Sequence, residues 1–195
     1  MKKFLALICF TSLVLTSCSN EGPPGPQGPT GPQGPEGPPG AATLGTVVDI
    51  QGDFNADNDY SLFLDFNDAG IEVFETDAIL VYTKVGENGT SDGQPVEVWR
   101  QLPQTYFLDD GTPIQYNFDY TFFDVNIWIE YGNKDLSEYS NLDGSWTDGL
   151  VFRVVVVPSD FAQNTNVDVS DYNAVAKQLQ LNDSDIQTLS VQPQL

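Results

Sequence analysis

Residues 105–123 have the sequence TYFLDDGTPIQYNFDYTFF, and this stretch decides the fold class. Apolar and aromatic side chains alternate with polar ones along its second half. The apolar set is Ile114, Tyr116, Phe118, Tyr120 and Phe122. A period of two is typical of a β-strand with one face on a core and the other in water. Asp109, Asp110 and Gly111 separate this strand from TYFLD, and such a turn between two strands predicts a β-hairpin.

The same pattern recurs on both sides of the hairpin and predicts about eight strands in all. The other segments are TVVDIQGDF from Thr46, DYSLFLDF from Asp59, AILVYTKV from Ala78, VEVWRQL from Val96, DVNIWIEYG from Asp124 and LVFRVVVVP from Leu150. Short strands separated by turn residues favour an antiparallel β-sandwich or barrel, and we expect the sandwich, over residues 43–160. The run RVVVV (residues 153–157) does not alternate, which indicates a central strand buried on both faces.

Residues 161–195 predict a short helix and a tail that pack on the sandwich. The segment VSDYNAVAKQLQL from Val169 has Ser170 as the expected N-cap and Asp171 in the first turn. One apolar stripe comprises Tyr172, Val175, Ala176 and Leu179. We expect this stripe to dock on a sheet, and IQTLSV from Ile186 to add a last short strand.

The composition excludes several kinds of catalytic site. The chain has 28 acidic and seven basic residues, a formal net charge of −21 and no histidine. Histidine bases, Ser-His-Asp and Cys-His arrangements and the usual His/Cys zinc sites are therefore absent. A chain this acidic repels phosphate groups, and we therefore expect no nucleic-acid partner. We also expect no cofactor. The charge suits cationic partners, but solubility of a tethered domain explains it more simply.

One loop carries oxygen-bearing side chains at alternate positions, as the first half of an EF-hand calcium loop does. These residues are Asp53, Asn55, Asp57 and Asp59. However, Asn58 stands where the motif needs glycine, and Leu64 where it needs the closing glutamate. The flanking segments also predict strands instead of helices. A polar hairpin turn is the simpler interpretation, and calcium binding is the alternative.

Trp99 and Trp128 are the candidates for contacts with a glycan. Both are in phase with the more polar side chains of their strands, and an aromatic ring on such a face can stack on a sugar. The more frequent explanation is a second packing layer, beneath a long loop or the C-terminal helix. A hydrolase would need a carboxylate pair, and no pair can be singled out among so many acidic residues. We therefore expect a protein that is not an enzyme.

Residues 1–17 predict a secretion signal. Lys2 and Lys3 precede an apolar segment, Phe4 to Leu15, which is too short to span a bilayer. The signal ends in Leu-Thr-Ser followed by Cys18, which resembles the lipobox of bacterial lipoproteins. The resemblance implies cleavage before Cys18, lipidation of its sulfur and new amino group, and attachment to a membrane. An ordinary signal peptide with a coincidental cysteine is the alternative.

Residues 22–42 place glycine at every third position. The glycines are Gly22, Gly25, Gly28, Gly31, Gly34, Gly37 and Gly40. Proline follows six of them, and proline makes the segment stiff and extended, with a reach of roughly 65 Å. The strict glycine period also permits a collagen triple helix, because only glycine fits at its axis. A homotrimer and a monomeric spacer both remain open.

Together, LTSC and GPPGPQGPTGPQGPEGPPG resemble small collagen-like lipoproteins of Gram-negative bacteria. The resemblance covers the first 42 residues and implies the cell envelope, at the outer membrane. The expected parts are a signal peptide (1–17), a lipidated N-terminus (18–21), a stalk (22–42), a head (43–160) and a C-terminal helix and tail (161–195). We expect a structural or partner-binding lipoprotein whose partner is on the surface or in the periplasm. A glycan-binding module and a carboxylate-dependent hydrolase are the alternatives.

Overall fold

The computed structural model describes residues 45–91, 93–164, 166–181 and 186–191. All of them belong to the compact unit Gly40–Leu195. The expected signal peptide, Cys18 and the repeat glycines Gly22 to Gly40 lie outside the described residues.

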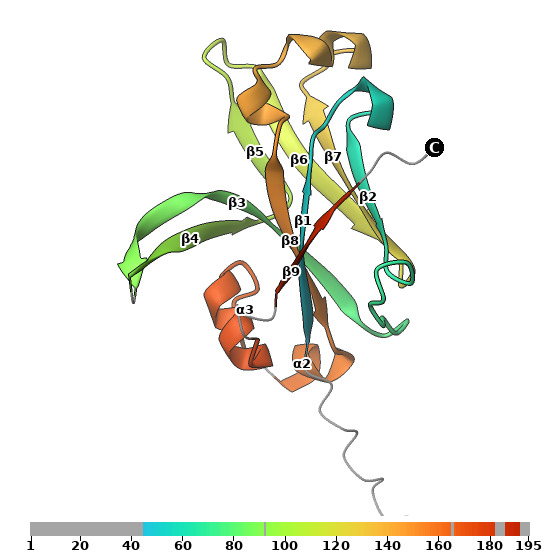
Figure 1. Ribbon diagram of the computed structural model, residues 1–195, viewed down its shortest axis with the longest axis vertical. Helices are drawn as coiled ribbons and strands as arrows, with labels where there is room; N and C mark the ends of the chain where they lie inside the picture. Colours follow the sequence, from blue (N-terminus) through green and yellow to red (C-terminus); the bar gives the residue numbers. More distant parts are fainter. Residues whose placement is uncertain (1–44, 92, 165, 182–185, 192–195) are drawn as a thin grey trace, which may run out of the picture. The chain divides into compact units, whose positions relative to one another are not determined.

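The fold is mainly β, as the sequence predicts (Figure 1). The described strands are β1 (Thr46–Gly52), β2 (Ser61–Asp65), β3 (Ala78–Ser91), β4 (Gln94–Gln101), β5 (Gln104–Phe107), β6 (Pro113–Tyr120), β7 (Asp124–Tyr131), β8 (Leu150–Val157) and β9 (Gln187–Ser190). The helices are α2 (Ser159–Asn164) and α3 (Tyr172–Leu179), with 3-10 turns η1 (Ala56–Asn58), η2 (Leu136–Asn141) and η3 (Gly144–Trp146). One sheet has the order β4-β3-β8-β1-β9 and the other has the order β2-β7-β6-β5. Neighbouring strands are antiparallel except β1 and β9, which are parallel.

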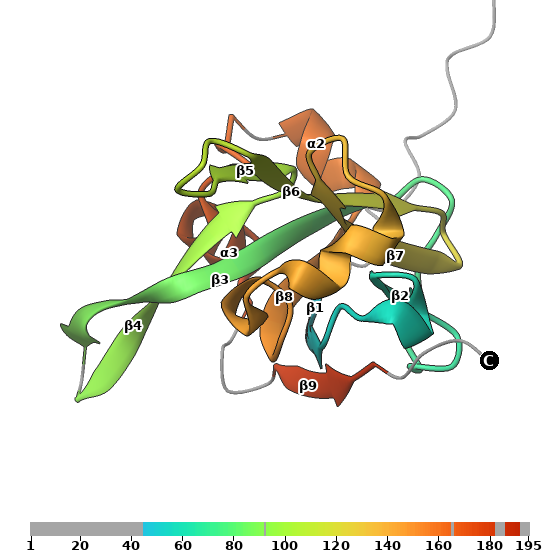
Figure 2. The ribbon, with the colours of Figure 1, turned by 90° about the horizontal axis from the view of Figure 1, so that it is seen from above.

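The two sheets share one hydrophobic core, and Figure 2 shows the same elements from above. The first sheet contributes Ile50, Val81 and Phe152, and the second contributes Leu62 and Ile127, all fully buried. The apolar set of DYSLFLDF is also confirmed, since Tyr60, Leu62, Leu64 and Phe66 are all buried. Burial of each such side chain stabilises the fold by about 1.5–3 kcal/mol relative to an exposed position.

Strand β8 is the central strand of the five-stranded sheet, between β3 and β1. Val154 and Val156 face the shared core, whereas Val155 and Val157 face a second cluster on the outer side of the sheet. The prediction that RVVVV is buried on both faces is confirmed. The burial also includes Arg153, the only charged residue in this strand.

The hairpin predicted around Asp-Asp-Gly joins β5 to β6. The Leu108 amide donates to the Thr112 carbonyl, and the Asp110 carboxylate accepts from the Thr112 amide. Gly111 has φ of +83°, a left-handed conformation that glycine adopts without strain. One part of the prediction is wrong: β6 ends at Tyr120, and Phe122 lies in the following turn and is exposed.

The C-terminal residues complete the five-stranded sheet and cover its outer face. Strand β9 pairs with β1, and α3 buries Tyr172, Val175 and Leu179 against the outer cluster. The predicted N-cap, Ser170, is wrong by one residue. The side chain of Asp171 caps the helix, because its Oδ1 accepts hydrogen bonds from the amides of Asn173 and Ala174.

Candidate functional site

A buried ion pair lies on the outer face of the five-stranded sheet. Asp49 of β1 and Arg153 of β8 stand directly opposite each other in the strand register. Asp49 Oδ1 accepts from Arg153 Nε at 2.7 Å and Oδ2 accepts from Nη2 at 2.8 Å. The side chains are only 11% and 5% exposed. A bidentate pair of this kind is strong and fixes both side chains in orientation.

Two aromatic rings contact the guanidinium of Arg153 from adjacent sides. Its central carbon lies 4.0 Å from the ring centroid of Trp99 in β4 and 4.7 Å from that of Tyr172 in α3. The two rings are 5.9 Å apart, centroid to centroid, and inclined at 53°. These contacts are cation–π interactions, and they join the sheet to the helix that covers it.

Further charges surround this arrangement. Glu97 approaches Arg153 Nη2 at 3.6 Å and accepts a 2.7 Å hydrogen bond from Lys84 Nζ. Burial alone would lower the pKa of Arg153, but the hydrogen bonds and charge of Asp49 outweigh it and raise that pKa. Hydrogen bonding to Glu97 similarly raises the pKa of Lys84. Both cations therefore remain charged at every physiological pH.

The ion pair, Glu97 and the two rings line a depression of about 650 Å³ beside β4 and α3. Its lining includes Asp49, Gln94, Glu97, Trp99, Tyr172 and Asn173. An aromatic surface beside carboxylate, amide and guanidinium groups is the combination that suits a ligand rich in hydroxyl groups. We call this feature the Trp99 depression.

The structure separates the two tryptophans that the sequence singles out. Trp99 is half-buried on the outer face of the five-stranded sheet, beneath α3, as the packing alternative expects. Trp128 is half-buried on β7 of the other sheet, where its indole N–H donates to Glu130 at 3.2 Å. Because they belong to different sheets and face away from the shared core, they cannot contact the same small ligand. A glycan contact remains a prediction for each.

The oxygen-rich loop of the calcium hypothesis uses its side chains to bond the backbone. Asn55 Oδ1 accepts from the Asp57 amide, and Asn58 Oδ1 accepts from the Asn55 amide. Asp53 Oδ1 accepts from the Gly149 amide at 2.6 Å. Across the part of the chain that the structure describes, no three His, Cys, Asp or Glu side chains gather closely enough to hold a metal ion. These bonds are those of a polar turn, and they account for Asp53, Asn55 and Asn58 without calcium.

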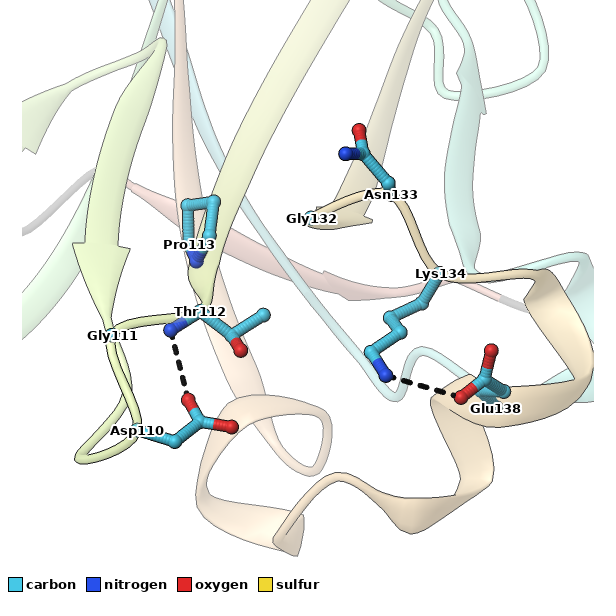
Figure 3. Close-up of a pocket in the computed structure, with 8 residues that line it drawn as sticks. All are labelled: Asp110, Gly111, Thr112, Pro113, Gly132, Asn133, Lys134 and Glu138. Atoms are coloured by element: carbon cyan, nitrogen blue, oxygen red, sulfur yellow. Dashed lines mark hydrogen bonds and ion pairs between the residues drawn. The ribbon is translucent and has the colours of Figure 1, made fainter.

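A second depression, of about 590 Å³, lies where the β5–β6 hairpin meets the segment after β7 (Figure 3). Lys134 forms an exposed ion pair with Glu138 at 3.3 Å, and Asp110 accepts from the Thr112 amide (Figure 3). The bonds to Thr112 lower the pKa of Asp110. This surface contains no aromatic ring and no buried charge, so it is less suited to a specific ligand than the Trp99 depression.

Comparison with protein-family models, with curated proteins and with solved structures gives no significant match. No helix within the described ranges is both long and apolar enough to cross a membrane.

Sequence reasoning places Trp99 on the correct face but misses Asp49 and Arg153 as a pair. The signal is present, because a single arginine directly precedes four valines in a strand predicted to be buried on both faces. Such an arginine needs a carboxylate partner. The sequence does not identify that partner, because it depends on which strand lies beside β8.

Proposed function

We propose that this chain is an envelope lipoprotein, attached at Cys18, which uses its collagen-like segment to present the double-sheet head to a partner. One observation carries the proposal. The head closes its own core, and its first strand begins at Thr46, four residues after the last repeat residue, Ala42. The head is thus a self-contained folded unit that directly follows the predicted stiff segment. Such a segment separates a head from a surface only when its other end is fixed.

Membrane fractionation of cells that express the whole chain tests the attachment. We expect the wild-type protein to pellet with the membranes as an acylated mature chain. The Cys18→Ala variant should give no acylated mature chain in that pellet. Cys9→Ala is the matched control, because Cys9 lies within the predicted signal and is removed with it. Equal behaviour of wild type and Cys18→Ala would refute the lipid anchor.

A second candidate function, glycan binding, is favoured by the Trp99 depression. It combines the Trp99 ring with the polar side chains of Gln94, Glu97 and Asn173 in a single concave surface. The buried pair of Asp49 and Arg153 holds the floor of that surface in a fixed geometry, which reduces the entropy lost on binding.

A glycan array followed by NMR titration of the identified sugar tests this function. Gln94→Ala and Asn173→Ala remove exposed lining groups without touching the ion pair, and we expect each to weaken binding several-fold. Trp128→Ala is the control on the opposite sheet and leaves binding unchanged. Binding that survives both lining variants but is lost in Trp128→Ala would move the site to the other sheet.

A further inference from the structure

The turn between β6 and β7 carries aromatic side chains where turn-forming residues are usual. Phe122 and Phe123 occupy its tip, at 39% and 52% exposure, and Tyr120 beside them is 43% exposed. We call these three residues the aromatic turn. Hairpin tips normally hold glycine, asparagine or aspartate, which accommodate the backbone of the turn. Two phenylalanines do not serve that purpose, and they expose apolar surface on a strongly acidic protein.

Hydrogen bonds hold the aromatic turn in a defined shape. The Thr121 amide donates to the Asp124 carbonyl at 2.9 Å, and the Phe123 amide donates to Thr121 Oγ1 at 3.0 Å. The Phe66 amide donates to the Phe123 carbonyl at 2.8 Å and ties the turn to the end of β2. The rings of Phe122 and Phe123 pack together with centroids 3.9 Å apart. Because the turn is already ordered, contacts with a partner cost little further conformational entropy.

The aromatic turn lies toward the end of the head at which β1 begins (Figure 1). Strand β1 starts at this end, and β2 reaches the same end at Asp65, which pairs with Asp124 (Figure 1). The loop that follows β2 lies there as well and exposes Phe74, at 49%. The aromatic turn and the exposed Phe74 therefore belong to two loops on the side of the head where β1 begins.

We propose that the aromatic turn is a contact between copies of this chain, which holds three heads together and stabilises a collagen triple helix of residues 22–42. Three chains in such a helix lie side by side around one axis. Only residues 43–45 separate the repeat from β1, and three residues span at most about 11 Å. A triple helix would then hold the β1 ends of three heads close together, and the aromatic turn offers exposed apolar surface on that side.

The length of the repeat explains why the head is needed. Seven glycine triplets provide little cooperative length for a triple helix, so association depends on a second contact that raises the effective concentration of the three chains. The acidic residues near the turn, Asp119 and Asp124, oppose this contact through like-charge repulsion. Added salt screens that repulsion, and trimers are therefore favoured as ionic strength rises from 0.1 M to 1 M.

The inference rests on the repeat named in the proposed function, but its test does not depend on the lipid anchor. Light scattering and sedimentation are measured on the mature chain with Cys18→Ser, which cannot be acylated. We expect the chain that carries only Cys18→Ser to form trimers. Adding Phe122→Ser and Phe123→Ser raises the protein concentration needed for half of the chains to be trimeric by at least about ten-fold. Phe107→Ser is the matched control: Phe107 is 71% exposed and lies at the other end of the four-stranded sheet, so trimers persist.

Circular dichroism and thermal unfolding confirm that the serine variants keep the fold, as their exposure in the monomer leads us to expect. The proposal is overturned if the chain that carries only Cys18→Ser stays monomeric, whether or not the natural chain is lipid-anchored. It is also overturned if trimers form equally well without both phenylalanines. A monomer that binds phosphatidylethanolamine–phosphatidylglycerol vesicles only when Phe122 and Phe123 are present would assign the turn to lipid and also refute the contact between heads.

Spin labels give a second readout that depends on geometry. With Cys18→Ser, the mature chain has no cysteine, so Asp119→Cys and Asp109→Cys each provide one exposed label site. Asp119 lies beside the aromatic turn, and Asp109 lies in the β5–β6 hairpin at the opposite end. We expect shorter distances between copies for labels at 119 than at 109. Equal distances, or shorter ones at 109, would contradict the proposed contact.

Discussion

Removal of Asp49 from its ion pair with Arg153 provides the strongest test of how the Trp99 depression is held together. In Asp49→Ala, the guanidinium loses both hydrogen bonds of a bidentate pair while it stays buried against Trp99 and Tyr172. Breaking one side of a buried ion pair costs about 3–5 kcal/mol, because the remaining charge is left uncompensated. Glu97 lies 3.6 Å away and offers partial replacement, so we expect a loss near the lower limit, about 3 kcal/mol.

Urea unfolding of the head measures this loss directly. With a slope of about 2 kcal/mol per molar urea, the unfolding midpoint of Asp49→Ala falls by about 1.5 M. Glu87→Gln is the surface control, because Glu87 pairs with Lys84 at 3.3 Å while half-exposed, and we expect a change below about 0.5 kcal/mol.

The double variant Asp49→Leu with Arg153→Met separates the ion pair from simple packing. Replacement of both charges by apolar groups removes the uncompensated cation, so this variant is more stable than Asp49→Ala alone. The reasoning is refuted if Asp49→Ala costs less than about 1 kcal/mol, or if the double variant is no more stable than the single one.

Three further predictions concern stability. Asp171→Ala removes the N-cap of α3 and lowers the free energy of unfolding by about 1 kcal/mol, whereas Ser170→Ala changes it little. Thermal or urea unfolding measures both, and a larger loss in Ser170→Ala would show that Ser170 is the cap. Burial raises the pKa values of Tyr82 and Tyr116, whose hydroxyls donate to backbone carbonyls, so the unfolded chain releases these protons first as the pH rises. Their stabilising contribution is complete below the unfolded tyrosine pKa near 10 and is lost above it, by about 1.4 kcal/mol per pH unit for each tyrosine; unfolding midpoints that stay constant from pH 9 to 11.5 would exclude this effect. Gly111→Ala forces a side chain into a left-handed turn and costs about 1 kcal/mol, and an unchanged melting temperature would show that the turn adapts.

The layers of this fold follow from the sequence because side-chain alternation reports directly on the two faces of a strand. Tyr60, Leu62 and Leu64 are buried as their phase predicts, whichever strands lie beside them. The unbroken valine run of β8 likewise predicts burial on both faces. These conclusions need only local information, and the structure confirms them.

Features that depend on strand order or on the exact end of an element are harder to predict from the sequence. Asp49 and Arg153 are 104 positions apart, and only the register of β1 on β8 brings them together. Phe122 keeps the phase of its strand, so alternation alone cannot show that the chain turns there. Ser170 and Asp171 are both good N-caps, and the choice between adjacent residues depends on the backbone geometry.

The collagen-like segment and the lipid anchor are predicted from the sequence alone, and the anchor can be tested directly. Mass spectrometry of the protein purified from bacterial membranes identifies its first residue and any covalent addition. We expect a mature chain that begins at Cys18 and carries the added mass of acyl groups on that residue. A chain that begins elsewhere, or an N-terminal Cys18 of unmodified mass, would contradict the claim that this head is presented from a lipid anchor.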